Sequence, residues 1–156
     1  MNFDLPLNIP EIKKIQRNRH PLLFVDQIFE LIPGKFAKGL KNFTYNEWFF
    51  PAHFDDEPNV PGFIQVESLV QVFIMTFLTL DDWAGEKTNF LKMEEVLFKR
   101  KIIPGEQLII EANLTSFKRG IAQGYAEGFV NNELACSAKF IIALPTYLSQ
   151  FKPKVQ

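Results

Sequence analysis

Residues 63–80 have the sequence Phe-Ile-Gln-Val-Glu-Ser-Leu-Val-Gln-Val-Phe-Ile-Met-Thr-Phe-Leu-Thr-Leu. This stretch is apolar on nearly every face of a helix, and Pro61 and Gly62 directly before it mark a helix start. Its chief polar interruptions are Gln65, Glu67, Ser68 and Gln71. A helix that is apolar all round is typical of one enclosed by protein, so the stretch predicts a long central helix.

A carboxyl group lies within this buried stretch, at Glu67. Burial disfavours the charged form of a carboxyl and raises its pKa, which makes Glu67 a candidate proton donor near neutral pH. Gln71 lies one helical turn later on the same face and is a candidate for orienting the acid. A plainer interpretation stays open, in which Glu67 is a structural carboxyl satisfied by backbone donors and Gln71.

His53 lies fourteen residues before Glu67 and is a candidate base. A neutral imidazole, with an ordinary pKa of about 6.5, can take up and return a proton at physiological pH. One base and one acid suit an elimination. The amide of Gly62, at the helix start, is a candidate for polarising a carbonyl oxygen. Taken alone, a histidine beside Phe50 and Phe54 is more often a partly buried, hydrogen-bonded residue.

The rest of the chain predicts one short helix, Pro10 to Asn18, and six strands. The strands are expected at Leu22–Leu31, Phe36–Phe43, Asn89–Lys99, Gln107–Phe117, Ile121–Val130 and Glu133–Leu144. Turn signals separate them at Pro33-Gly34, Pro104-Gly105, Lys118-Arg119-Gly120 and Asn131-Asn132. One long helix followed by consecutive antiparallel strands predicts an α+β fold in which the sheet wraps around the helix.

The composition fits one domain over residues 1–156, with a helical segment at 1–18 and a loosely held tail at 145–156. The 17 basic and 18 acidic residues give a net charge of −1, so nucleic acid is not an expected partner. The single Cys136 cannot form an intrachain disulfide and is expected to be a small core residue. The first thirty residues lack a secretory signal, and the apolar run Val72–Leu80 is too short to span a bilayer. A cytoplasmic protein with no membrane insertion is expected.

Four neighbouring residues suggest an alternative, a metal site: His53, Asp55, Asp56 and Glu57. Carboxylates this close together can hold a hard cation. The run has no recognisable metal-loop spacing and no second histidine nearby, so a metal site is disfavoured.

The segment around His53 and Glu67 resembles the active-site segment of the beta-hydroxyacyl-acyl-carrier-protein dehydratases, hotdog-fold enzymes of fatty acid synthesis. That family's pattern runs His-Phe, a short turn, Pro-x-x-Pro-Gly, and then Glu four residues before Gln. The matching residues here are His53-Phe54, Pro58, Pro61-Gly62, Glu67 and Gln71. Three further blocks resemble the family in its own order: Arg19–Asp26, Pro33–Lys35 and Phe98–Leu108. Ala52, Asp55 and Asp56 replace residues that the family usually has, so the resemblance is to a divergent member.

This resemblance implies a hotdog fold and the removal of water from a (3R)-3-hydroxyacyl thioester to give the trans-2-enoyl product. His53 would take the C2 proton, the Gly62 amide would hold the thioester oxygen, and Glu67, oriented by Gln71, would help the 3-hydroxyl leave. Whether His53 alone shuttles the proton while Glu67 positions the hydroxyl stays open. The related dehydratase-isomerases typically have aspartate at the position of Glu67. The glutamate here therefore favours dehydration without isomerisation. No metal or redox cofactor is implied.

The resemblance also implies partners. An acyl carrier protein, or coenzyme A, would carry the substrate on its phosphopantetheine. The basic cluster Lys99, Arg100 and Lys101, with Lys118-Arg119, is either a contact surface for an acidic carrier or plain solvated charge. A homodimer is expected, with His53 and Glu67 meeting across the interface and with a trimer of dimers as a further assembly. Candidates for lining an acyl tunnel are Phe63, Val66, Val70 and Phe98, with core packing as the plainer interpretation.

Two other functions stay open. In the first, Asp55 and Asp56 have abolished the catalytic activity of the site, and the protein is a module that binds acyl thioesters or carrier proteins. A hotdog acyl-thioester hydrolase ranks below that, because such enzymes generally lack the arrangement from His-Phe to Pro-Gly.

Overall fold

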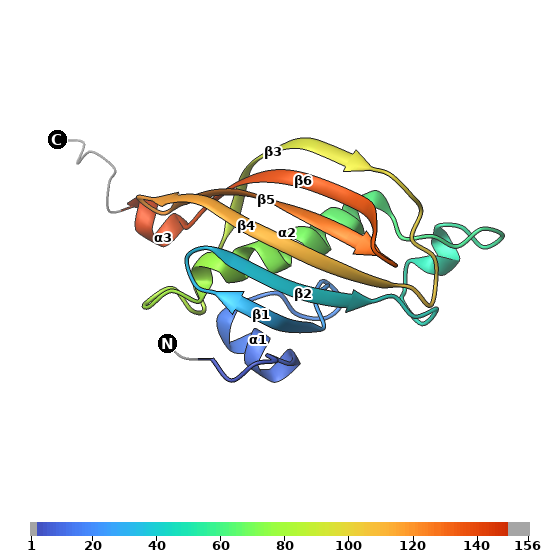
Figure 1. Cartoon of the computed structure of the whole chain (residues 1–156), viewed down its shortest axis with the longest axis horizontal. Helices are drawn as coiled ribbons and strands as arrows, with labels where there is room; N and C mark the ends of the chain where they lie inside the picture. The colour runs from blue at the N-terminus through green and yellow to red at the C-terminus, as the bar shows by residue number, and fades with distance from the viewer. Residues whose placement is uncertain (1–2, 150–156) are drawn as a thin grey trace.

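The central helix, α2 (Gly62–Leu78), lies against the inner face of a curved six-stranded antiparallel sheet (Figure 1). The computed structural model describes residues 3–149. The strand order is β1-β2-β4-β5-β6-β3, so β1 and β3 form opposite edges of the sheet. The strands span Gln27–Ile32 (β1), Phe36–Asn42 (β2), Asn89–Phe98 (β3), Gln107–Lys118 (β4), Ile121–Val130 (β5) and Glu133–Ala143 (β6). The remaining helices are α1 (Ile9–Ile15), the 3-10 turn η1 (Phe50–Ala52) and α3 (Pro145–Leu148). The predicted α+β fold is confirmed.

The observed bounds of the elements differ most from the predicted bounds near the N-terminus. The first strand begins at Gln27 rather than Leu22. The backbone N–H of Phe24 donates to the side chain of Gln71 instead of to a strand, so this segment is fixed by α2. α1 ends at Ile15 rather than Asn18, because Gln16 already has an extended backbone.

The helix α2 is buried along almost its whole length, and only Gly62, Phe63 and Glu67 of its residues are not. Its buried hydroxyls bond back to helix carbonyls, as Ser68 does to the carbonyl of Ile64 at 2.9 Å. This local bonding satisfies the hydroxyls, whereas Oε1 of the buried Gln65 has no hydrogen-bond partner within residues 3–149.

Close approach of the sheet to α2 requires a glycine in β5. A Cβ at Gly124 would lie 2.1 Å from the carbonyl oxygen of Asn113 and 2.5 Å from the ring of Phe73. The absent side chain makes room for the Phe73 ring, which also packs against Phe77 and Phe140. Cys136 of β6 is fully buried, and burial raises the pKa of its thiol to about 12, as expected of an inert core residue.

The described part of the expected loose tail is packed against the fold. Tyr147 of α3 lies against Trp83 with ring centroids 5.0 Å apart. Residues 150–156 of that tail lie outside the described residues. None of the helices within residues 3–149 is long and apolar enough to cross a membrane.

We expect Phe73→Ala to lower the free energy of unfolding by about 3–5 kcal/mol, because it opens a cavity between α2 and the sheet. The matched control is Phe29→Ala in β1, where the ring is only half-buried and lies under the Lys38 ammonium. That change is expected to cost about 1 kcal/mol or less. Urea unfolding of both variants measures the difference, and equal losses would contradict the assignment of the core to the α2 side of the sheet.

Candidate active site

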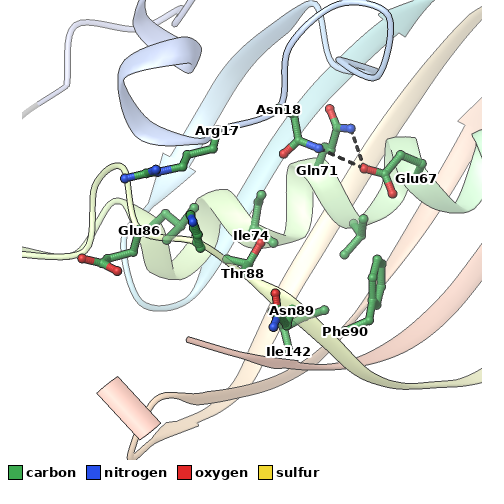
Figure 2. A pocket seen from close by; sticks show the side chains of 13 residues that line it. Arg17, Asn18, Glu67, Gln71, Ile74, Glu86, Thr88, Asn89, Phe90 and Ile142 are labelled. Atoms are coloured by element: carbon green, nitrogen blue, oxygen red, sulfur yellow. Dashed lines mark hydrogen bonds between the residues drawn. The ribbon is translucent and has the colours of Figure 1, made fainter. Parts of the chain in front are cut away.

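Glu67 is the one acidic residue of α2, and it is held by two amide donors (Figure 2). The side chain of Gln71 donates to Glu67 Oε1 at 2.7 Å, and that of Asn18 donates to the same oxygen at 3.2 Å. The second carboxyl oxygen accepts no hydrogen bond from residues 3–149. Glu67 therefore presents one restrained oxygen and one available oxygen.

Gln71 is fully buried, and its side-chain amide forms three hydrogen bonds with neighbouring groups. Its Oε1 accepts the backbone N–H of Phe24 at 2.7 Å, and its Nε2 donates to the carbonyl of Leu22, also at 2.7 Å. These two backbone contacts fix which end of the amide is nitrogen. The remaining N–H must then point to Glu67, so the geometry places Gln71 where an orienting residue would have to be.

Burial raises the pKa of Glu67 above its ordinary value, while the hydrogen bonds from Gln71 and Asn18 lower it in part. The desolvation of the carboxylate is the largest of these effects. A carboxyl with a raised pKa keeps its proton to higher pH and is suited to general acid chemistry.

Two hollows meet at Glu67. The first, here called the inner hollow, has a volume of about 310 Å³ and follows one stripe of α2. Its wall on α2 consists of Glu67, Val70, Gln71, Ile74 and Leu78, and Asn18 and Arg17 lie opposite. The second, the outer hollow, has a volume of about 430 Å³ and a mostly apolar wall. Its lining includes Gly62, Phe63, Val66, Glu67 and Phe98.

Gly62 lines the outer hollow at the start of α2. Its N–H has no acceptor within the described residues, as is usual at the first position of a helix. A Cβ at Gly62 would lie 2.9 Å from the ring of Phe98, so this residue type allows β3 to pack against the helix start. The result is an unpaired N–H at the positive end of the α2 dipole.

His53 lies just after η1, in a loop closed by two contacts with Asn59. The Nδ1 of His53 lies 3.0 Å from the carbonyl oxygen of Asn59, and the Asn59 N–H donates to the carbonyl of His53 at 2.9 Å. A carbonyl oxygen only accepts, so in the neutral imidazole Nδ1 carries the proton and Nε2 carries the lone pair. Half-buried and stacked on Phe54, the ring is fixed in the tautomer that a general base needs.

The acidic residues that follow His53 lie at an exposed loop tip. Phe54 and Glu57 close a tight turn, and Asp55 and Asp56 are its exposed tip. Within residues 3–149 neither aspartate forms a hydrogen bond or an ion pair, whereas Glu57 pairs with Lys101. Among the same residues no group of three or more His, Cys, Asp or Glu side chains is placed to hold a metal ion.

The structure brings most, but not all, of the sequence-predicted site residues together. The outer hollow contains Gly62, Phe63, Val66, Glu67 and Phe98, and the inner hollow contains Val70. His53 lines neither hollow, so one chain does not join the candidate base to the candidate acid.

Asn18 was not predicted to be a functional residue. The sequence marked it only as a polar residue at the end of the expected first helix, directly before the block Arg19–Asp26. Only the folded chain shows that this residue reaches Glu67, forty-nine positions later.

The basic cluster at 99–101 is largely neutralised. Arg100 pairs with Glu106 and lies 3.6 Å from Glu133, and Lys101 pairs with Glu57. Of the three cations, only Lys99 has no carboxylate partner in the described part of the chain.

Comparisons with known proteins show that this chain is similar to dehydratases. Residues 17–139 match the FabA-like domain family. The 3-hydroxyacyl-[acyl-carrier-protein] dehydratase FabZ of Clostridioides difficile is 40% identical over 138 residues, which cover 88% of this chain and 97% of that protein. Its namesake from Syntrophomonas wolfei is 38% identical over 140 residues, with 90% and 97% covered. In fold, the dehydratase heterocomplex ApeI:P from Xenorhabdus doucetiae is similar, with a TM-score of 0.76 at 15% identity, covering 97% of this chain and 100% of that chain.

We expect Glu67→Gln to stabilise the protein at neutral pH. The folded pKa of Glu67 lies above the ordinary value of 4.5, so ionisation of the buried carboxyl costs folding free energy. This cost is absent below about pH 4.5, where the wild-type carboxyl is protonated in both states, and it appears as the pH rises through the folded pKa. A glutamine avoids it and still offers an oxygen to Asn18 and Gln71.

Thermal unfolding of the two proteins across acid to neutral pH measures this difference. The unfolding temperature of the variant should exceed that of the wild type at neutral pH, and the two temperatures should converge in acid. A constant difference at every pH would show that the charge of Glu67 is not the cause.

Proposed function

The chain belongs to the family of 3-hydroxyacyl-[acyl-carrier-protein] dehydratases with a FabA-like domain, and we propose that His53, Gly62 and Glu67 carry out its reaction. It is a hydro-lyase that removes water from a 3-hydroxyacyl thioester in fatty acid biosynthesis. For its site we propose a (3R)-3-hydroxyacyl substrate and a trans-2-enoyl product. The observation that carries this proposal is the partly buried Glu67, restrained at one oxygen and open at the other, where the two hollows meet.

In the proposed reaction, Nε2 of His53 takes the proton from C2 of the substrate. The electron pair of that C–H bond forms the C2–C3 double bond, and the C3–O bond breaks. The leaving oxygen takes the acid proton of Glu67 and departs as water. The N–H of Gly62 stabilises the charge that develops on the thioester oxygen. Return of the proton from His53 to Glu67 restores both groups.

The direction of the substrate follows from the two hollows. Gly62 lines only the outer hollow, so the thioester lies there, beside Phe63, Val66 and Phe98. The 3-hydroxyl must meet Glu67, and the acyl chain beyond C3 then continues into the inner hollow. Its α2 stripe ends at Leu78, about 16 Å from Glu67 along the axis. This assigns Val70 to the acyl chain and the other three tunnel candidates to the thioester arm.

A homodimer would supply the missing base. Every residue of the edge strand β3 is exposed in the single chain. Its exposed large apolar side chains are Phe90, Leu91, Met93, Val96, Leu97 and Phe98. An unpaired edge strand and an apolar patch both favour association. A second copy that covers β3 would close the outer hollow and place its own His53 beside Glu67. The trimer of dimers stays a prediction.

For the substrate carrier we propose the phosphopantetheine of an acyl carrier protein, with coenzyme A as a substitute in assays. The proposed chemistry is proton transfer, so it calls for no metal or redox cofactor. Among the basic candidates, Lys99 and Lys118 have no carboxylate partner in residues 3–149, whereas Arg100 and Lys101 have one. Lys99 and Lys118 are therefore stronger candidates than Arg100 and Lys101 for contact with an acidic carrier.

We expect His53→Ala and Glu67→Gln each to abolish conversion of 3-hydroxyacyl thioesters to the conjugated enoyl product, followed by absorbance. Dimers assembled from a mixture of the two inactive chains should recover about a quarter of wild-type turnover, because half of them are mixed and each contains one intact site of two. Each single variant must fold, which circular dichroism checks.

The mixture separates the possible outcomes. No recovery would place His53 and Glu67 of one chain in the same site and overturn the shared arrangement. An inactive wild type that gains turnover when Asp55 and Asp56 are replaced by Pro and Gly would instead support a silenced binding module. Release of free thiol without the enoyl product would indicate a hydrolase.

Ile74→Phe tests the direction of the substrate. A larger ring in the inner hollow should reduce turnover of 3-hydroxymyristoyl thioesters by about tenfold or more while 3-hydroxybutyryl thioesters are spared, because only the longer chain reaches Ile74. Ile32→Phe, at an exposed position of β1, is the matched control and should leave the chain-length preference unchanged. An equal loss with both substrates would reject the inner hollow as the acyl site.

A further inference from the structure

Asn18 lies between α1 and β1, outside the segment that contains the proposed catalytic residues. Its side-chain amide donates to Oε1 of Glu67, the oxygen that also accepts from Gln71 (Figure 2). Asn18 lines both the inner and the outer hollow, so it lies at the point where the substrate would pass the acid.

We propose that Asn18 is a positioning residue: together with Gln71 it confines the acid proton of Glu67 to Oε2, the oxygen left open to the substrate. This inference rests on the proposed function, in which Glu67 protonates the leaving hydroxyl. Figure 2 shows the second carboxyl oxygen turned away from both amides.

The chemistry of the amide groups requires this placement. Both nitrogens are donors, and Oε1 therefore faces two N–H groups. A proton on Oε1 would take the place of one of these N–H donors and weaken the hydrogen bond from the other, whereas a proton on Oε2 leaves both hydrogen bonds intact. The protonated acid thus has one favoured form, and that form directs its O–H away from the amides.

Asn18 is itself fixed by a guanidinium. Arg19 donates from Nη1 to the carbonyls of Gln16 and Asn18 and from Nη2 to that of Lys13, each at 2.8 Å. Three carbonyls at the end of α1 are thereby joined to one rigid planar group. The backbone of Asn18 is held in place, so its side chain meets Glu67 from a defined direction.

No ion pair competes with the two amides for Glu67 within residues 3–149. The charged side chains that share the inner hollow are Arg17, two residues after α1, and Glu86 and Lys87 after α2. The outer hollow has no other charged side chain in its lining. Within the single chain, burial raises the pKa of Glu67, and the hydrogen bonds from Gln71 and Asn18 lower it. In the proposed dimer, His53 of the second copy is the further titratable group beside it.

The test compares Asn18→Leu, which keeps the size and removes the donor, with Asn18→Asp, which keeps the shape and replaces the donor by an acceptor. Carbon-13 NMR of labelled Glu side chains, assigned with Glu67→Gln, measures the titration of the Glu67 carboxyl directly. Amide donors favour the ionised form, so the titration midpoint should rise in Asn18→Leu and rise further in Asn18→Asp.

The kinetics should change in a way that a purely structural residue would not produce. In Asn18→Leu, kcat should fall about tenfold, the factor expected for one hydrogen bond to a catalytic acid, while KM is retained. The alkaline limb of the pH profile of kcat should move to higher pH, because the acid keeps its proton to higher pH. The lower kcat follows because the weaker acid donates that proton less readily. Asn113→Leu, a half-buried asparagine of β4, is the control and should change neither property.

Unchanged Glu67 titration in both variants would overturn the inference, whatever the activity. A raised midpoint with unchanged kcat and an unmoved pH limb would overturn it too, because Asn18 would then bind Glu67 without affecting the reaction. If the wild type shows no dehydration, the proposed function fails, and the NMR titration still decides whether Asn18 controls the proton of Glu67.

Discussion

Burial of α2 inside the sheet is the constraint on which the rest of this structure depends. A helix enclosed on nearly all sides must satisfy every polar side chain from within the protein. Its hydroxyl groups do so locally, as Ser68 does, and Gln71 does so through the backbone of residues 22–24. Glu67 is the one ionisable group on the helix, and its polarity is only partly satisfied. Glu67, the proposed acid, is thus the ionisable exception on a helix that is otherwise enclosed in the core.

Most of the fold could be predicted because its signals are local. Apolar runs, turn residues and the Pro61-Gly62 helix start lie next to the elements that they specify, and the six strands and the long helix follow them closely. The first strand was predicted to begin at Leu22 because that run is apolar, but a distant side chain, Gln71, binds its backbone instead. Long-range contacts of this kind leave no periodic signal.

The candidate site could be predicted only in part, for the same reason. Glu67 and Gln71 are one helical turn apart, so their contact follows from spacing. Asn18 approaches from another segment of the chain, and the ion pairs that neutralise Arg100 and Lys101 also join distant residues. His53 and Glu67 line no common hollow of the single chain, so their meeting across a dimer interface stays a prediction.

The three contacts of the Gln71 amide join the N-terminal segment and the acid into one cooperative unit. An opening fluctuation that separates residues 22–24 from α2 also releases the Gln71 side chain from its fixed position beside Glu67. Both changes occur in a single step. Backbone amide exchange at Phe24 would therefore report the same opening that disorders the acid. The lifetime of the competent site is then bounded by the local stability of a segment that contains no proposed catalytic residue.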